Sequence, residues 1–234
     1  MSANSIVKNA LASYKENELI LASKLYRGRL AEQISEATYY KVLERMCKAG
    51  ELVKLAKSTY HLPKKSKYGL VPPSEKEIIF AFTGHETGTV IGYSLYNALN
   101  LTTQISKTVN VLSSELEGKI KSIRNVIVHQ MPLVFSEDVK NMVHGLEVLQ
   151  NFSTIQEINY PAFIAFAEQL ASTYDGESFN KVISAKSYKK STISFLNEIL
   201  SYYGVKNNLS KHLSALSVYK HPKMEELYEA ARIS

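Results

Sequence analysis

Residues 35–63 read SEATYYKVLERMCKAGELVKLAKSTYHLP and divide into a helix-like half and a strand-like half. Ser35 is a favourable N-cap, and apolar residues recur after it at helical spacing as far as Gly50, a typical C-terminal glycine. Residues 51–56 and 58–62 are typical of two strands joined by a tight turn. A helix followed by a two-stranded ribbon is the order of a recognition helix and its wing.

The residues before this stretch complete the pattern. Apolar side chains at helical spacing predict helices over residues 5–14 and 22–31, and the short apolar run Leu19–Leu21 predicts a strand between them. The order is therefore helix, strand, helix, helix, strand, strand. From it we expect a winged helix-turn-helix DNA-binding domain over residues 1–63.

The third helix carries an apolar face and a second face whose residues are polar or cationic. The second face contains Thr38, Lys41, Arg45 and Lys48, at spacings of three, four and three. Long donors on an anchored helix suit the base edges and phosphates of the major groove, although a solvated amphipathic helix has the same pattern. We expect the start of the helix nearest the bases and Arg45 nearer the backbone. The residues expected to contact DNA are Ser35, Thr38, Tyr40, Lys41, Arg45, Lys48, Lys54, Lys57, Lys64 and Lys65.

Positive charge is confined to the start of the chain. Residues 1–68 contain 13 Lys and Arg against 6 Asp and Glu, a net charge of +7, and the remaining residues contribute −1 to the total of +6. Such asymmetry favours contact between one end of the molecule and a polyanion. A solubilising surface is the plainer interpretation of the same charge.

Three further parts follow the predicted winged helix. Residues 64–73 predict a basic linker, residues 74–135 a small mixed α/β segment, and residues 136–234 a helical C-terminal region. The fold class expected is therefore α+β. The elements expected after the linker are helices over 75–82, 93–100, 160–174, 189–203, 209–217 and 222–231, and strands over 89–91, 108–112 and, as one continuous strand, 119–130.

Composition excludes several classes of protein. The chain has one cysteine, Cys47, so an intrachain disulfide and a cysteine zinc site are both ruled out. No apolar run reaches the length of a membrane span, and the N-terminus lacks the pattern of a secretory signal. We therefore expect a cytoplasmic protein of prokaryotic type with no membrane contact, no metal, no cofactor and no catalytic residues.

One enzyme alternative is left open. Glu117-Gly118-Lys119 matches the E-x-K half of a metal-dependent nuclease signature. Such a site also needs an upstream carboxylate on an adjacent strand, and no aspartate occurs before Asp138. A charged turn between strands is the simpler interpretation of these residues.

Two segments resemble the AbiEi-type antitoxin family. The first is YYKVLERMCKAGELVKLAKSTYHLP, residues 39–63, and the second comprises GLVPPS, residues 69–74, with GYSLYNALNLTTQ, residues 92–104. The resemblance covers about residues 5–130. The wing turn of the family usually carries Arg-Gly where this chain has Lys57-Ser58, and Asn100 stands where glycine is common. Asparagine tolerates the left-handed conformation better than most residues, so that turn is expected to survive.

The resemblance implies a bacterial antitoxin of an abortive-infection, phage-defence system. Such a protein binds its operator as double-stranded DNA, represses its own operon as a transcriptional repressor, and counters a nucleotidyltransferase-like toxin. The segment after the wing takes part in the function, either as a partner contact or as a structural motif. Its residues here are Gly92, Asn97, Thr102, Thr103 and Gln104. A stand-alone winged-helix transcriptional regulator and a pure protein-interaction module remain alternatives.

Overall fold

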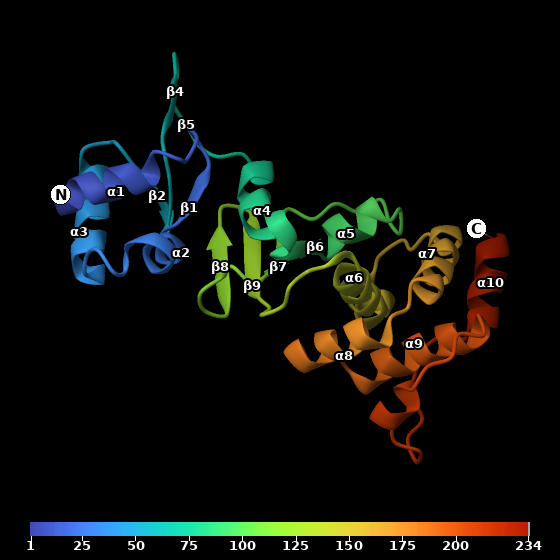
Figure 1. Cartoon of the computed structure of the whole chain (residues 1–234). Helices are drawn as coiled ribbons and strands as arrows, with labels where there is room; N and C mark the ends of the chain where they lie inside the picture. The colour runs from blue at the N-terminus through green and yellow to red at the C-terminus, as the bar shows by residue number, and fades with distance from the viewer. Residues whose placement is uncertain (234) are drawn as a thin grey trace. The chain divides into compact units, whose positions relative to one another are not determined.

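The computed structural model describes residues 1–233 and shows a mixed α+β protein, the class expected from the sequence (Figure 1). The chain forms two compact units. The first unit comprises Met1–Phe82 and Lys121–Val126, and the second comprises Thr83–Ile120 and the residues from Ile127 onward. Each unit contains its own cluster of buried hydrophobic side chains. Within the described residues, every helix is too short or too polar to reach across a bilayer.

The first unit packs helices on a small antiparallel sheet whose strand order is β1-β3-β2. Strand β3 lies in the middle, because Leu19 of β1 and Val53 of β2 both face His61 in the registers of the two pairs. Its helices bury one side each, and Val7, Tyr39 and Leu43 are completely buried. The elements of this unit are α1 (Ala3–Leu11), β1 (Leu19–Leu21), α2 (Ala22–Leu25), α3 (Glu36–Lys48), β2 (Val53–Ala56), β3 (Thr59–His61), β4 (Lys64–Ser66), β5 (Gly69–Val71) and α4 (Glu75–Thr83).

The prediction of one regular helix over residues 22–31 is wrong, because the segment changes from α-helical to π-helical within its length. Helix α2 ends at Leu25, and a π-helical turn continues it over Tyr26–Leu30. The wider turn keeps both Leu25 and Leu30 buried although they stand five residues apart. Gly28, which weakens a regular α-helix, lies at the centre of the turn.

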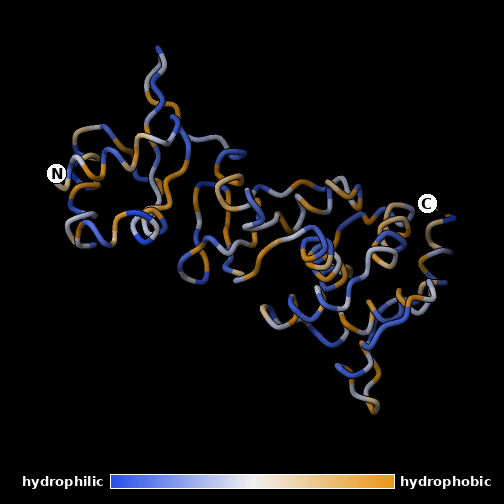
Figure 2. The backbone as a smooth tube through the Cα atoms, viewed as in Figure 1, coloured by the Kyte–Doolittle hydropathy of each residue, from blue (hydrophilic) through white to orange (hydrophobic). Residues whose placement is uncertain are grey.

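The segment expected as a linker forms strands β4 and β5. They pair as an antiparallel hairpin, with Lys64 opposite Val71 and Ser66 opposite Gly69. The Ser66 hydroxyl closes the turn, because it donates to the Gly69 carbonyl at 3.1 Å and accepts from the Tyr68 amide at 3.2 Å. Gly69 supplies a φ of +113° that a residue with a Cβ rarely adopts. The hairpin projects from the first unit, and its tip is hydrophilic (Figures 1 and 2).

A segment from later in the chain completes the first unit. The Lys121 ammonium donates to the Thr59 hydroxyl of β3 at 3.2 Å, and Thr59 is completely buried. The Asn125 amide donates to the Glu75 carboxylate at the start of α4. The strand expected over residues 119–130 is therefore wrong as one continuous element: the chain reverses at Arg124, whose φ is +55°, and forms two strands.

The second unit combines a sheet with a group of helices. Its strands belong to a sheet of order β6-β7-β9-β8, in which β8 (Ile120–Ile123) belongs, from Lys121 onward, to the first unit. Longest among its helices is α6, which buries eight residues, including Gly145 and Glu147. The elements are β6 (Gly88–Ile91), α5 (Tyr93–Ala98), β7 (Val109–Ser113), β9 (Val126–Gln130), α6 (Glu137–Asn151), α7 (Tyr160–Ser172), α8 (Gly176–Ala185), α9 (Lys190–Tyr202) and α10 (Met224–Ile233).

One hydrophobic core joins the two parts that the sequence analysis separated at residue 136. The cluster includes Ile91 of β6 and Leu112 of β7 together with Phe163 of α7 and Leu227 of α10. The helix expected over residues 209–217 is wrong: only a 3-10 turn over Leu209–His212 forms.

Candidate nucleic-acid interface

Helix α3 separates its side chains as the sequence predicted. Tyr39, Val42, Leu43 and Met46 are buried, while Lys41, Arg45 and Lys48 are exposed. We call these three exposed residues the basic face of α3. A helix of 3.6 residues per turn produces this division because the two sets of residues differ in phase by about half a turn.

The start of α3 is fixed by its own hydroxyl groups. The Ser35 hydroxyl accepts from the Thr38 amide at 3.3 Å and lies 2.8 Å from the Thr38 hydroxyl. Ser35 is exposed, whereas Thr38 is half-buried. Both hydroxyl groups expected near the bases therefore serve first as the N-terminal cap of the helix.

The residues of the basic face differ in their local partners. The Lys48 ammonium pairs with the Glu44 carboxylate at 2.7 Å, and this contact raises the pKa of Lys48. The Arg45 Nε donates to the Lys41 carbonyl at 3.3 Å, which orients the guanidinium along the helix. Among the described residues, neither Lys41 nor Arg45 has an ion-pair partner, so the charges of both are available to a ligand.

Tyr40, expected to contact DNA, makes internal contacts through its hydroxyl. The oxygen lies 3.0 Å from the Ser23 hydroxyl of α2 and 3.1 Å from the Ser58 hydroxyl of the turn between β2 and β3. The side chain is half-buried. Tyr40 therefore joins α3 to the neighbouring helix and to the turn, which a pattern of exposed polar residues could not indicate.

The hairpin of β2 and β3 carries one exposed lysine on β2 and one in its turn. Lys54 and Lys57 are exposed, and the pairing register shifts between Lys54 and Ala56. Ser58 has a φ of +54°, the left-handed conformation that glycine adopts most easily. Serine thus takes the backbone conformation of the glycine that is usual at this place in the family that the segment resembles.

The hairpin β4–β5 adds a second exposed group of lysines. Lys64 and Lys65 are exposed on β4, as a role in contacting DNA would require. Lys67 in the turn continues the basic run of Lys64 and Lys65, as the sequence indicates, whereas Tyr68 was not predicted. The Lys67 ammonium lies 4.9 Å from the centre of the Tyr68 ring. Tyr68 is 88% exposed. The signal in the sequence was the run KKSKYG, residues 64–69, in which the glycine marks a turn.

Three exposed basic residues of the second helical segment were not among the predicted contacts. They are Lys24 of α2 and Arg27 and Arg29 of the π-helical turn. Their contribution to the charge of residues 1–68 was the only signal for them.

The polar residues of the 92–104 segment hold a loop of the second unit. The Asn97 amide donates to the carbonyls of Thr102 and Gln104, at 2.7 and 3.0 Å. The Thr102 hydroxyl donates to the Gln156 carbonyl at 2.7 Å. These contacts favour the structural interpretation of the motif.

The ends of this segment fit the same interpretation. Gly92 precedes α5 with a φ of +68°, and Asn100 adopts the expected left-handed conformation with a φ of +57°. The Gln104 side-chain amide donates to the Glu157 carboxylate at 2.7 Å. Thr103 is exposed, and it is the residue of the motif most open to a partner.

The residues of the nuclease alternative lie on a turn. Glu117 and Lys119 are exposed on either side of Gly118, whose φ is +87°. Over residues 1–233, no group of three or more histidine, cysteine or acidic side chains is arranged to hold a metal ion.

Comparisons with known proteins give no further assignment. No protein-family model matches the chain, and no curated protein matches it significantly.

Proposed function

We propose that residues 1–63 form a winged helix-turn-helix that binds double-stranded DNA, with α3 as the recognition helix. The observation that carries the proposal is the basic face of α3: Lys41, Arg45 and Lys48 are exposed along one side of a helix whose other side is anchored in a core. Such a helix enters the major groove with its long donors toward bases and phosphates.

The arrangement around α3 supports the proposal. Strands β2 and β3 follow α3 in the chain and are neighbours in the sheet, whose order is β1-β3-β2. The contact between the Tyr40 and Ser58 hydroxyls places the turn of this hairpin beside α3. In a winged helix, this hairpin is the wing that meets the phosphate backbone. Lys57 at its turn, with Lys64 and Lys65 on β4, extends the positive charge along the backbone of a bound duplex.

We further propose that the protein is an antitoxin that represses its own operon and counters a nucleotidyltransferase-like toxin in the cytoplasm. The support for this part is the resemblance of residues 39–63, 69–74 and 92–104 to AbiEi-type antitoxins. Expression of the neighbouring gene with and without this chain tests it. We expect growth arrest that this chain relieves, and a toxin-independent regulator would give no relief.

DNA binding is tested by fluorescence anisotropy with the DNA upstream of the protein's own gene. We expect Lys41→Ala/Arg45→Ala to weaken binding by about 30-fold or more, because each of the two lost contacts contributes about 1–3 kcal/mol. Lys15→Ala/Lys76→Ala removes the same charge from exposed positions of the same unit outside α3 and the β2–β3 turn. Equal loss in both variants would contradict the proposal, because it would show dependence on net charge alone.

A further inference from the structure

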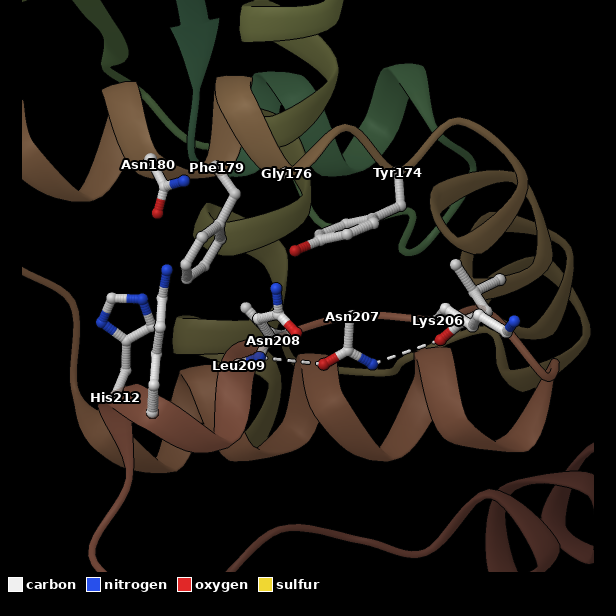
Figure 3. A pocket seen from close by; sticks show the side chains of 11 residues that line it. Tyr174, Gly176, Phe179, Asn180, Lys206, Asn207, Asn208, Leu209 and His212 are labelled. Atoms are coloured by element: carbon white, nitrogen blue, oxygen red, sulfur yellow. Dashed lines mark hydrogen bonds between the residues drawn. The ribbon is translucent and has the colours of Figure 1, made fainter.

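A cavity of about 380 Å³ lies in the second unit, and none of its lining residues belongs to the candidate nucleic-acid interface (Figure 3). Its walls come from the start of α8 and from the loop that follows α9, residues 205–212. Figure 3 shows Tyr174 and Phe179 pointing from the α8 side toward Asn207, Asn208 and His212 on the other side. Cavities of roughly 300–1,000 Å³ are typical of small-molecule sites.

The charge of the lining favours an anion. Lys206 and Lys211 line the cavity, and none of the lining residues is acidic. Among the described residues, neither lysine has an ion-pair partner. The two carboxylates nearest in sequence are both engaged elsewhere. Asp175 caps α8, where it accepts from the amides of Glu177 and Ser178, and Glu177 pairs with Lys181 at 2.7 Å. Two unpaired ammonium groups at one cavity are suited to phosphate.

The aromatic side chains favour a planar ring. The Phe179 ring lies 6.5 Å from Tyr174 and 5.5 Å from His212, centre to centre, and it meets the His212 ring edge to face. Phe179 is almost completely buried and is therefore rigid, whereas Tyr174 is half-buried. Phe179 therefore supports Tyr174 from behind, and the accessible Tyr174 ring is the kind of platform on which nucleobases stack.

Several polar groups of the cavity have no hydrogen-bond partner among the described residues. His212 Nε2 is buried without a hydrogen-bond partner, which is unusual for a polar atom inside a protein. The side-chain amides of Asn180 and Asn208 make no hydrogen bonds among the described residues. Asn207 differs, because it donates to the Val205 carbonyl and accepts from the Leu209 amide, and so it shapes the loop.

We propose that this cavity binds a nucleoside phosphate, with the base against Tyr174 and the phosphates on Lys206 and Lys211. The amides of Asn180 and Asn208 offer both donors and acceptors, which suits the edge of a base. The site belongs to the second unit and requires nothing from the basic face of α3, so it is independent of the proposed DNA binding.

Isothermal titration of the full chain with ATP, adenosine and inorganic phosphate tests the proposal. We expect ATP to bind with a dissociation constant below about 1 mM and the two fragments at least about tenfold more weakly, since each offers only part of the recognised chemistry. Lys206→Ala/Lys211→Ala should weaken ATP binding by about tenfold or more. Lys107→Ala/Lys119→Ala, which removes two exposed lysines of the same unit, should leave it unchanged.

A second measurement places the ligand. The His212 ring proton, identified by its loss from the NMR spectrum of His212→Gln, should shift on addition of ATP, and Tyr174→Leu should weaken binding without loss of the folded spectrum. The proposal is overturned by any of three results: no ATP binding at about 5 mM, inorganic phosphate binding as tightly as ATP, or affinity lost in Lys41→Ala/Arg45→Ala but retained in Lys206→Ala/Lys211→Ala.

Discussion

The hydroxyl of Tyr40 on α3 lies 3.1 Å from the hydroxyl of Ser58 in the β2–β3 turn, and this contact fixes the turn relative to the helix. The same Tyr40 oxygen lies 3.0 Å from the Ser23 hydroxyl, so one side chain joins three elements. A helix and a hairpin that bind the same DNA duplex must keep a fixed position relative to each other, and a contact of this kind provides it.

Tyr40→Phe removes this connection while it keeps the ring. We expect the free energy of unfolding to fall by about 1 kcal/mol, the usual value for hydrogen bonds of a partly buried hydroxyl. DNA affinity should fall as well, because the turn is no longer held in place. Urea unfolding and anisotropy measure the two effects. Tyr68→Phe is the matched control, since Tyr68 is 88% exposed, and an equal loss of stability there would contradict the structural role of Tyr40.

Lys57→Ala tests the β2–β3 turn as a phosphate contact. The slope of log affinity against log salt should decrease in magnitude by about 0.9, the contribution of one neutralised phosphate. Titrations with the upstream DNA between about 50 and 200 mM KCl measure the slope. Lys15→Ala should leave it unchanged. A Lys57→Ala slope equal to that of the wild-type chain would remove the turn from the interface.

The sequence predicted the elements whose boundaries have local causes. Helix α3 begins at the cap that Ser35 provides and ends before Gly50, whose φ is +70°, as capping rules require. The exposure of Lys41, Arg45, Lys54 and Lys57 also followed from periodicity and turn position. These features depend on residues within a few positions of one another, so one sequence is enough to specify them.

Elements that depend on distant contacts were missed. Helix α6 was not singled out, because Gly145 and Glu147 interrupt its apolar pattern although both are buried. Glu147 is accommodated there by Lys186, 39 residues away, and by the Tyr188 hydroxyl at 2.8 Å. The internal role of Tyr40 was missed for the same reason, since Ser23 and Ser58 lie 17 and 18 residues away. Spacing along one helix carries no information about such partners.

Gly145→Ala should destabilise the second unit. A Cβ at Gly145 would lie 2.5 Å from Cδ1 of Leu170 on α7, and Leu170 is buried, so the neighbour has little room to move. Overpacking of about 1–3 kcal/mol exceeds the roughly 1 kcal/mol that alanine gains over glycine in a helix. Thermal unfolding measures the difference.

Gly28→Ala provides the matched control for Gly145→Ala. Nothing lies within 4 Å of a Cβ at Gly28, and its φ is not positive. We expect this variant to be as stable as the wild-type chain or more stable by up to about 1 kcal/mol. If Gly145→Ala were equally tolerated, the close packing of α6 on α7 would be disproved.

His144 should make stability depend on pH between about 4 and 6.5. Burial lowers its pKa from 6.5 to about 4, and its Nε2 lies 2.6 Å from the Thr89 hydroxyl. The unfolded chain therefore binds the proton more tightly, so stability is full above pH 6.5 and is lost as the pH falls toward 4. The loss amounts to about 3 kcal/mol for this group.

Replacement of His144 by glutamine separates its titration from that of other groups. Urea unfolding of wild type and His144→Gln should converge as the pH falls from 6.5 to 4, because only the wild type loses this contribution. His61 and His129, whose pKa values burial also lowers, titrate in both proteins and cancel in the comparison. Parallel pH profiles for the two proteins would rule out His144 as the responsible group.

The first unit includes six residues, Lys121–Val126, that lie well beyond Phe82 in the chain. The hydrogen bond from the Lys121 ammonium to the buried Thr59 hydroxyl is one of the contacts that join them to it. A gene fragment ending after α4 would encode that unit without its last piece. A single recombination event could not transfer this unit intact to another protein, since the donor would have to contribute two separate stretches of coding sequence. We expect the two units to be inherited together, and their specificities to diverge by point substitution rather than by exchange.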